Sequence, residues 1–213
     1  MRQAGSSPVN PESEFRNPKS PLSRPLPAFL LLVFALLVAA GAARAVLSMH
    51  AERALLQTGD ARWIWYSHDI PSPRWMRFHA TREFVLDDLP ARAVAKVFAD
   101  RRHVLYINGF GMGGGEQKPG DPLFLHDLTP QLRRGENRLV LVVESATGAG
   151  GLLVALDISG VGRNALVSDG TWRVDLSPDA IQKGGRYQAA VWGRPPMYPW
   201  RYPRMPRPNE LGL

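Results

Sequence analysis

Two kinds of hydrophobic pattern divide the chain. From Leu26 to Ala43 the residues are apolar and carry no charge. From Trp63 onward, short apolar runs are separated by turn residues at intervals of about eight to twelve, which is the spacing of a β-sandwich. After Gln57 no long stretch has the 3.6-residue period of an amphipathic helix, which disfavours parallel βαβ architecture. The pattern therefore predicts an all-β, antiparallel β-sandwich preceded by a single N-terminal helix.

The apolar segment is long enough to cross a membrane. Residues 28–49 would make about 33 Å of helix, which exceeds the roughly 30 Å hydrocarbon core, with Arg44 reaching back to the interface. A cleaved secretory signal is the alternative, because Ala43-Arg44-Ala45 has the small-x-small pattern of a cleavage site. The long, Pro-rich polar stretch before Leu26 favours an uncleaved signal anchor.

Both interpretations export the rest of the chain. Basic residues before the apolar segment, Arg16, Lys19 and Arg24, favour a cytoplasmic N-terminus. We therefore expect a single-pass membrane protein with its C-terminal domain on the extracytoplasmic side. The expected segments are a disordered Pro-rich tail (1–25), a transmembrane helix (26–49), a juxtamembrane stalk (50–60), a β-sandwich domain (61–193) and a Pro/aromatic-rich tail (194–213).

Alternation of apolar and polar residues marks the strands of the sandwich. In residues 152–158 the side chains of Leu152, Val154, Leu156 and Ile158 share one face, and residues 139–143 behave in the same way. These faces are predicted to form the core. The expected strands are Ala61–Tyr66, Arg77–Leu86, Ala93–Ala99, His103–Asn108, Asn137–Ser145, Leu152–Ser159, Ala165–Val167, Trp172–Asp175 and Tyr187–Val191.

Local signals add turns and core positions. Asn108-Gly109 and Asp169-Gly170 are dipeptides that favour the positive φ of tight hairpin turns. Trp63 and Trp65 are two residues apart, which predicts that both indoles fill the core from one face of their strand. Gly59 is expected to end a helical stalk.

Composition narrows the function classes. The 213 residues contain no cysteine, which excludes disulfides, thiolate metal sites and cysteine nucleophiles. The formal net charge of +7 comes largely from the two ends of the chain, and no element carries a basic stripe beyond the C-terminal tail. Nucleic-acid binding is therefore not expected.

Several catalytic patterns are present only in part. Residues 109–114 satisfy G-x-G-x-x-G, but the following Pro-rich residues cannot form the helix that a dinucleotide site needs, and we interpret them as a glycine-rich hairpin loop. Ser67-His68-Asp69 cannot form a relay because the three residues are adjacent. No G-x-S-x-G is present, and the histidines lack ligand spacing. Loop carboxylates at Asp100, Glu116, Asp121 and Asp127 are expected to be solvated rather than a glycosidase pair.

Aromatic residues offer a binding chemistry. Trp75 lies in a loop between prolines and arginines, where an exposed indole can stack on a sugar while polar neighbours bind hydroxyls. It would equally well close an edge of the core. The tail at residues 194–208 interleaves Tyr198, Trp200 and Tyr202 with prolines. We expect it to pack on the sandwich, with presentation to a partner or to anionic headgroups as the alternative.

The segments from Trp63 to Val174 resemble a known module. The resemblance is carried by ARWIW (61–65), RFHATREFVL (77–86), the LYING run (105–109), HDLT (126–129), GEN (135–137), GLL (151–153) and SDGTW (168–172). These runs are similar to the galactose-binding-like jelly-roll module found at the N-terminus of bacterial α-L-rhamnosidases. The catalytic barrel of those glycosidases has no counterpart in this sequence.

The resemblance implies a non-catalytic sandwich with ligands bound by loops at one rim. It places Asp100, Arg101 and Asn108 nearest the family's loop and turn motif, and our own interpretation adds Trp75 and Arg102 as ligand-binding residues. No catalytic residue, no metal ligand and no cofactor is expected. Such modules often carry a structural calcium, but no dense Asp/Asn cluster marks a site here.

Three functions stay open at this point. The first is a membrane-anchored module that binds carbohydrate at the cell envelope. The second is a structural or interaction module that docks an envelope protein, or an accessory component of a glycoside hydrolase system. The third is an enzyme in its own right, which would need paired carboxylates in a cleft.

Overall fold

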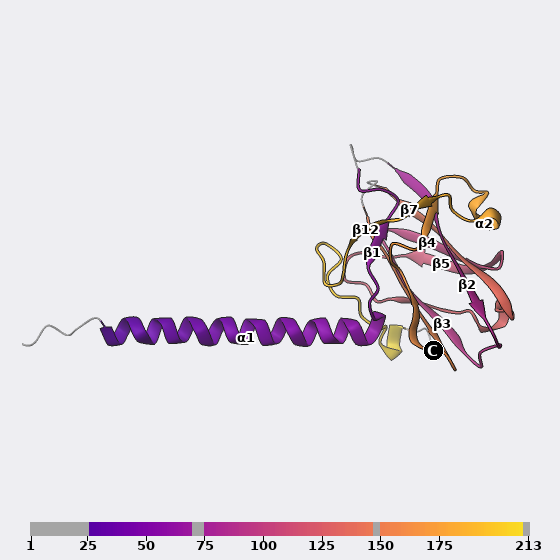
Figure 1. Ribbon diagram of the computed structural model, residues 1–213. Coiled ribbons are helices and arrows are strands. Elements are labelled where there is room, and N and C mark those ends of the chain that lie inside the picture. The colour runs from indigo at the N-terminus through magenta and orange to yellow at the C-terminus, as the bar shows by residue number, and fades with distance from the viewer. Residues whose placement is uncertain (1–25, 70–74, 147–149, 211–213) are drawn as a thin grey trace, which may run out of the picture. The chain divides into compact units, whose positions relative to one another are not determined.

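The computed structural model describes residues 26–69, 75–146 and 150–210 (Figure 1). Contacts along the chain divide it into two compact units, Met1–Arg44 and Ala45–Leu213. We describe each unit by itself. The tail expected at residues 1–25 lies outside the described residues.

The helix α1 runs from Leu26 to Thr58. Its portion Ala28–Val46 is long and apolar enough to cross a membrane, and none of it is buried within the protein. The helix continues through most of the expected stalk and ends before Gly59, as the sequence predicts. Gly59 has a φ of 59°, and a Cβ there would come within 2.8 Å of the Asn164 Cβ, so a side chain is excluded by both conformation and space.

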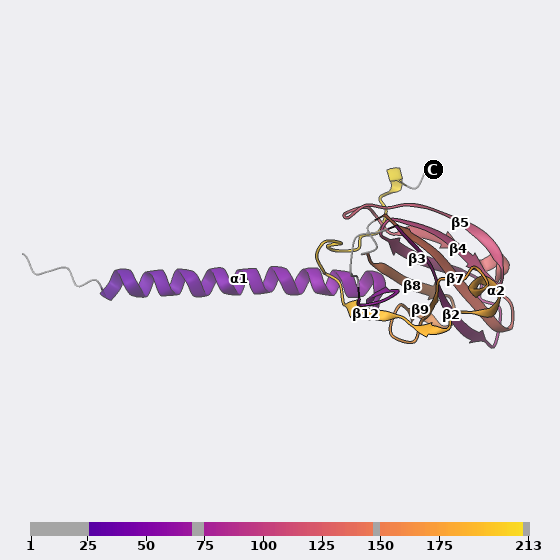
Figure 2. The ribbon, with the colours of Figure 1, turned by 90° about the horizontal axis from the view of Figure 1, so that it is seen from above.

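The rest of the chain forms two six-stranded sheets packed face to face (Figures 1 and 2). All pairings within them are antiparallel. The first sheet has the order β12-β1-β8-β3-β6, with β9 also paired to β8, and the second has the order β11-β10-β2-β7-β4-β5. The strands are β1 (Trp63–Trp65), β2 (Met76–Leu86), β3 (Ala93–Ala99), β4 (Arg102–Ile107), β5 (Phe110–Glu116), β6 (Phe124–Asp127), β7 (Gly135–Ser145), β8 (Leu152–Ile158), β9 (Gly162–Val167), β10 (Arg173–Asp175), β11 (Tyr187–Gln188) and β12 (Ala190–Gly193). The remaining elements are η1 (Thr129–Gln131), α2 (Ala180–Lys183) and η2 (Pro208–Glu210).

The fold class is confirmed, and each expected strand overlaps an observed one. The sequence analysis missed β5 and β6. The glycine-rich segment interpreted as a loop is in fact the strand β5, which pairs with β4 along the edge of the second sheet. Glycine is needed there because the backbones approach closely: a Cβ on Gly114 would lie 1.9 Å from the carbonyl oxygen of His103. With four glycines among its seven residues, the strand has too few side chains for a sequence pattern to show alternation.

The two predicted turns differ in outcome. Asn108 and Gly109 have φ values of 53° and 86° and form the two-residue hairpin loop between β4 and β5, as expected from an Asn-Gly dipeptide. Asp169-Gly170 also forms a turn, closed by a hydrogen bond from the Trp172 amide to the Asp169 carbonyl. The prediction of a hairpin at this turn is wrong, because the strands on either side of it, β9 and β10, belong to different sheets.

The sandwich has two apolar clusters. The main core lies between the sheets and includes the predicted alternating residues of β7 and β8. A second cluster contains Trp63, Phe98, Leu153 and Trp200 and is separate from the first. The C-terminal segment packs on the domain, as expected, because Trp200 is buried in this second cluster.

Trp63 and Trp65 are both fully buried, which confirms that they fill the core. The expectation that they share one face is wrong, since Trp65 belongs to the main core and Trp63 to the second cluster. An irregular register between Trp63 and Ile64 in the pairing with β12 is the physical reason, because a bulge breaks the strict alternation of side chains.

Two buried histidines connect the sheets near their β4 and β6 sides. The Nε2 atoms of His103 and His126 lie 2.9 Å apart, and the two side chains are almost completely buried. Burial, with repulsion from His126, lowers the pKa of His103 to about 3. Burial also lowers the pKa of His126. The pair is therefore neutral at physiological pH.

Acid is expected to destabilise the domain through His103. The unfolded chain binds a proton below its ordinary pKa of about 6.5 while the folded chain does not, so stability is complete above that pH and is lost as the pH falls. From about pH 7.5 to pH 5 the free energy of unfolding should fall by about 2 kcal/mol from this residue. Urea denaturation of the full chain at both pH values measures the difference. The variant His103→Leu should show a smaller pH dependence, and an unchanged dependence would contradict the assignment.

Candidate functional site

The five residues that the sequence analysis selected lie at opposite ends of the sandwich. Met76 pairs with Ser145 and Arg102 pairs with Glu144, so Trp75, Asp100, Arg101 and Arg102 come to one end. Asn108 follows the last residue of β4 and lies at the other end. The structure therefore brings four of the five together and separates the fifth.

The end with Trp75 is open and charged. The Trp75 side chain is 64% exposed, and Glu144 lies 3.6 Å from the Arg77 guanidinium and 3.8 Å from that of Arg102. Asp100 is half-buried and accepts a hydrogen bond of 2.9 Å from the indole nitrogen of Trp200. Its carboxylate is thus engaged in holding the C-terminal segment.

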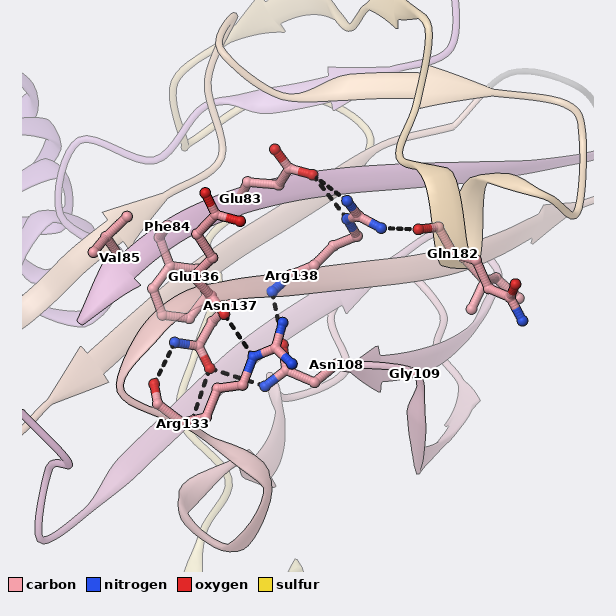
Figure 3. A pocket seen from close by; sticks show the side chains of 11 residues that line it. Glu83, Phe84, Val85, Asn108, Gly109, Arg133, Glu136, Asn137, Arg138 and Gln182 are labelled. Carbon is pink, nitrogen blue, oxygen red and sulfur yellow. Dashed lines mark hydrogen bonds and ion pairs between the residues drawn. The ribbon is translucent and has the colours of Figure 1, made fainter.

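The end with Asn108 contains a cavity of about 410 Å³ (Figure 3). Its walls come from the ends of β2 and β7, from the β4–β5 hairpin turn, from the loop before β7 and from α2. It is lined by Glu83, Phe84, Val85, Asn108, Gly109, Arg133, Glu136, Asn137, Arg138, Ile181 and Gln182.

A buried asparagine organises one side of this cavity. Asn137 is 1% exposed; its amide nitrogen donates to the carbonyls of Arg133 and Gly135, and its side-chain oxygen accepts from the Arg133 amide. The same oxygen accepts a hydrogen bond of 2.9 Å from the Asn108 side chain. Asn137 therefore fixes the loop that carries Arg133.

Asn108 has a structural part in the same network. Its amide nitrogen donates to the Gln131 carbonyl and to Asn137, and its oxygen accepts from the Arg138 amide. These contacts tie the hairpin turn to the neighbouring loop (Figure 3). Asn108 thus shapes the cavity wall by positioning other groups.

The alternation of two paired strands places four side chains over one face of the second sheet. Glu83 is opposite Arg138, and Val85 is opposite Glu136. The Arg138 guanidinium lies 2.6 Å from the Glu83 carboxylate and also donates to the Gln182 carbonyl. This arginine is therefore occupied by protein partners.

Two charged groups at the cavity have polar atoms that are free to bind a ligand. The Arg133 guanidinium uses its Nε to donate to the Glu136 carbonyl at 2.7 Å. Among the described residues, its two terminal nitrogens have no hydrogen-bond partner, and the Glu136 carboxylate has none either. The exposed Val85 supplies apolar surface beside them.

This arrangement is suited to binding a neutral, polyhydroxylated molecule. The cavity has two glutamates and two arginines, whose charges cancel. Its net charge therefore does not favour a charged ligand over a neutral one. A free guanidinium donates to hydroxyl oxygens, a free carboxylate accepts from hydroxyl hydrogens, and apolar surface covers the C–H groups. Within the described part of the chain, no group of three or more His, Asp or Glu side chains is placed to hold a metal ion.

The sequence analysis missed four polar residues of this cavity. Glu83, Arg133, Glu136 and Arg138 looked like solvated positions of strands and a turn. Alternation along β7 predicts that Glu136 and Arg138 share one face of that strand. Their position opposite β2 depends on the register, which is set by the folded sheet.

No family model and no curated protein matches the chain. Among solved structures, the sandwich is similar to an α-L-rhamnosidase of Streptomyces avermitilis complexed with L-rhamnose, with a TM-score of 0.59 and 19% identity over 68% of this chain and 16% of that one. A GH78 family rhamnosidase of Bacillus sp. GL1 gives 0.57 and 23% identity over 70% and 20% of the two chains. A lectin from Pleurotus ostreatus in complex with GalNAc gives 0.59 and 17% identity over 70% and 48%. These identities show a shared fold, and the chain spans less than half of each of these proteins. The sandwich is thus similar in fold to modules of rhamnosidases and of the lectin, as the resemblance in the sequence implies.

Proposed function

We propose that the protein is a membrane-anchored, non-catalytic module that binds carbohydrate at the cell envelope. The observation that carries the proposal is the cavity that the free Arg133 guanidinium, the free Glu136 carboxylate and the exposed Val85 line together. Hydrogen bonds of Asn137 and Asn108 fix the backbone that carries these groups. Function is argued from this site, because the fold alone hosts several functions.

The chemistry of the cavity fits a sugar ring. A pyranose presents hydroxyls that both donate and accept, and it also presents C–H patches that pack on apolar side chains. The similar rhamnosidase and lectin structures are complexes with L-rhamnose and GalNAc, which are neutral sugars carrying a methyl or an acetyl group. The exposed Val85 would lie against such an apolar substituent.

The helix α1 supports the membrane part of the proposal. A stretch of 19 residues, Ala28–Val46, has the length and hydropathy of a spanning helix, and basic residues precede it. We propose that it anchors the chain in a single pass and holds the sandwich on the extracytoplasmic side.

A glycan-binding assay with matched variants tests the proposal. The full chain in detergent micelles is screened on a glycan array, and the best neutral glycan is titrated by calorimetry. Arg133→Ala and Glu136→Ala should each weaken binding by about tenfold, because each removes hydrogen bonds to a charged group, worth about 1.5 kcal/mol. Glu116→Ala, an exposed glutamate at the other end of β5, serves as the control and should leave binding unchanged.

Two results would count against this site. An array without any bound glycan would contradict carbohydrate binding as a function. Binding that is lost in Trp75→Ala but kept in Arg133→Ala and Glu136→Ala would place the ligand at the opposite end of the sandwich, where Trp75 and Arg102 lie.

A further inference from the structure

A second cavity, of about 400 Å³, lies over the first sheet and has a different charge balance. Its polar walls come from β3, β8 and the turn between β8 and β9, and Met205 of the C-terminal segment closes one side. The buried Lys96 and the exposed Arg92 and Arg163 are among the residues that line it. The sugar cavity described above shares none of these residues.

Lys96 is an unusual residue for the middle of a strand. Only 3% of its side chain is exposed, and a buried ammonium is unfavourable unless it is paired. Its Nζ donates to Asp157 at 2.8 Å and to the Asn164 side chain at 2.6 Å. An ammonium has three donors, and no acceptor for the third is found among the residues that the structure describes. Because Lys96 lines the cavity, this donor is available to a ligand there.

The two arginines add positive charge, although Asp127 lies near Arg92 and Asp157 lies near Arg163. Both Arg92 and Arg163 are exposed, and neither guanidinium forms an ion pair or a hydrogen bond within the described part of the chain. Partial burial is the largest single effect on Asp157 and raises its pKa, but the hydrogen bonds from Lys96 and the Asn164 amide, together with the charges of Lys96 and Arg163, keep the pKa of that carboxyl below its usual value. Among the residues that line the cavity, three cations therefore face one anion. Asp127 outside the lining offsets part of the charge of Arg92, and the cavity keeps a net positive charge.

Much of the remaining lining is apolar. Val94, Leu125 and Met205 contribute apolar side chains, and Ser159 and two glycines complete the lining. A ligand that fills the cavity would thus place an anionic group between the three cations and lay a less polar body against these side chains. Charge-assisted hydrogen bonds to a fixed ammonium and to guanidinium groups are about twice as strong as neutral ones.

We propose that this cavity is a binding site for the carboxylate or phosphate group of a small anionic ligand, held by Lys96, Arg92 and Arg163. The site is independent of the sugar cavity at Arg133 and Glu136. The module would thus have a second binding site, over the first sheet, that selects acidic molecules over neutral ones.

Calorimetric titration of the full chain in uncharged detergent tests the site. The probes are D-glucuronate, inorganic phosphate and D-glucose, the last being the neutral match of the first. We expect millimolar or tighter binding of at least one anion and none of glucose at this cavity. Binding of glucuronate alone assigns a carboxylate ligand, and binding of phosphate alone assigns a phosphate ligand.

The variants locate the binding. Arg92→Gln and Arg163→Gln change exposed residues, so the fold is kept, and each should weaken anion binding by about tenfold. The double variant Lys96→Met with Asp157→Asn removes the buried pair without leaving one charge alone and should abolish binding. Lys183→Gln, an exposed lysine on α2, is the control for the same loss of charge, and Glu136→Ala should leave anion binding intact while it weakens neutral glycans.

Three results would overturn the proposal. The first is that neither anion binds in the millimolar range. The second is that glucose binds as tightly as glucuronate in Glu136→Ala, the variant in which the sugar cavity is weakened. The third is that Arg92→Gln and Arg163→Gln weaken binding no more than Lys183→Gln does, which would assign the effect to overall charge.

Discussion

Replacing Trp200 by alanine is expected to lower the free energy of unfolding by about 3 to 5 kcal/mol, the range for a buried aromatic residue. The indole is 7% exposed, and its ring centre lies 4.9 Å from that of Trp63. It packs so closely on Gly151 that a Cβ there would come within 2.9 Å of the indole. Its loss would open the second apolar cluster and expose Trp63 and Phe98 to solvent.

The same change would free the C-terminal segment. The indole nitrogen of Trp200 donates to Asp100, so the variant also leaves this half-buried carboxylate without its partner. Urea denaturation of the full chain, followed by tryptophan fluorescence, measures the effect. Tyr198→Ala is the control from the same segment, because Tyr198 is 89% exposed, and it should cost less than about 0.5 kcal/mol. Equal losses in the two variants would show that Trp200 does not hold the segment.

Asn137→Ala is expected to cost about 3 kcal/mol and to weaken glycan binding in the molecules that stay folded. The side chain makes four hydrogen bonds to groups of Arg133, Gly135 and Asn108. Alanine leaves several of these groups buried without a partner, at about 1 to 3 kcal/mol for each group that water cannot reach. The loop that carries Arg133 would then lose its fixed geometry.

Binding and stability are measured separately for this variant. Thermal denaturation gives the loss of stability, and calorimetry with the glycan at a temperature well below the transition gives the loss of affinity. The neighbouring variant Glu136→Ala should weaken binding while it changes stability by less than about 0.5 kcal/mol. If Asn137→Ala binds the glycan as the wild type does, the loop geometry does not matter for binding.

Most of the fold follows from local patterns. The alternation in residues 139–143 and 152–158 predicted two central strands, and the Asn108-Gly109 dipeptide predicted the observed hairpin turn. These features are visible in sequence because side chains alternate strictly on a strand whose two faces differ, and because few residues adopt positive φ. Where most residues of a strand are glycines, as in β5, the pattern carries no signal.

The candidate sites depend on contacts between distant segments. Lys96 was not selected from the sequence because a lysine in a strand is normally solvated, and its burial depends on Asp157 and Asn164 from another strand and turn. Glu136 and Arg133 meet Glu83 and Phe84 only through the pairing of β2 with β7. No spacing along the chain encodes these distances.

The sequence by itself determined an apolar helix followed by an antiparallel sandwich, because hydrophobic periodicity and turn chemistry are local and each segment carries its own. The tertiary structure alone decided where ligands could bind. It separated Asn108 from Trp75, grouped the charged residues of two cavities and buried Trp200 over Trp63, since strand register and the packing of the C-terminal segment are fixed by the whole domain.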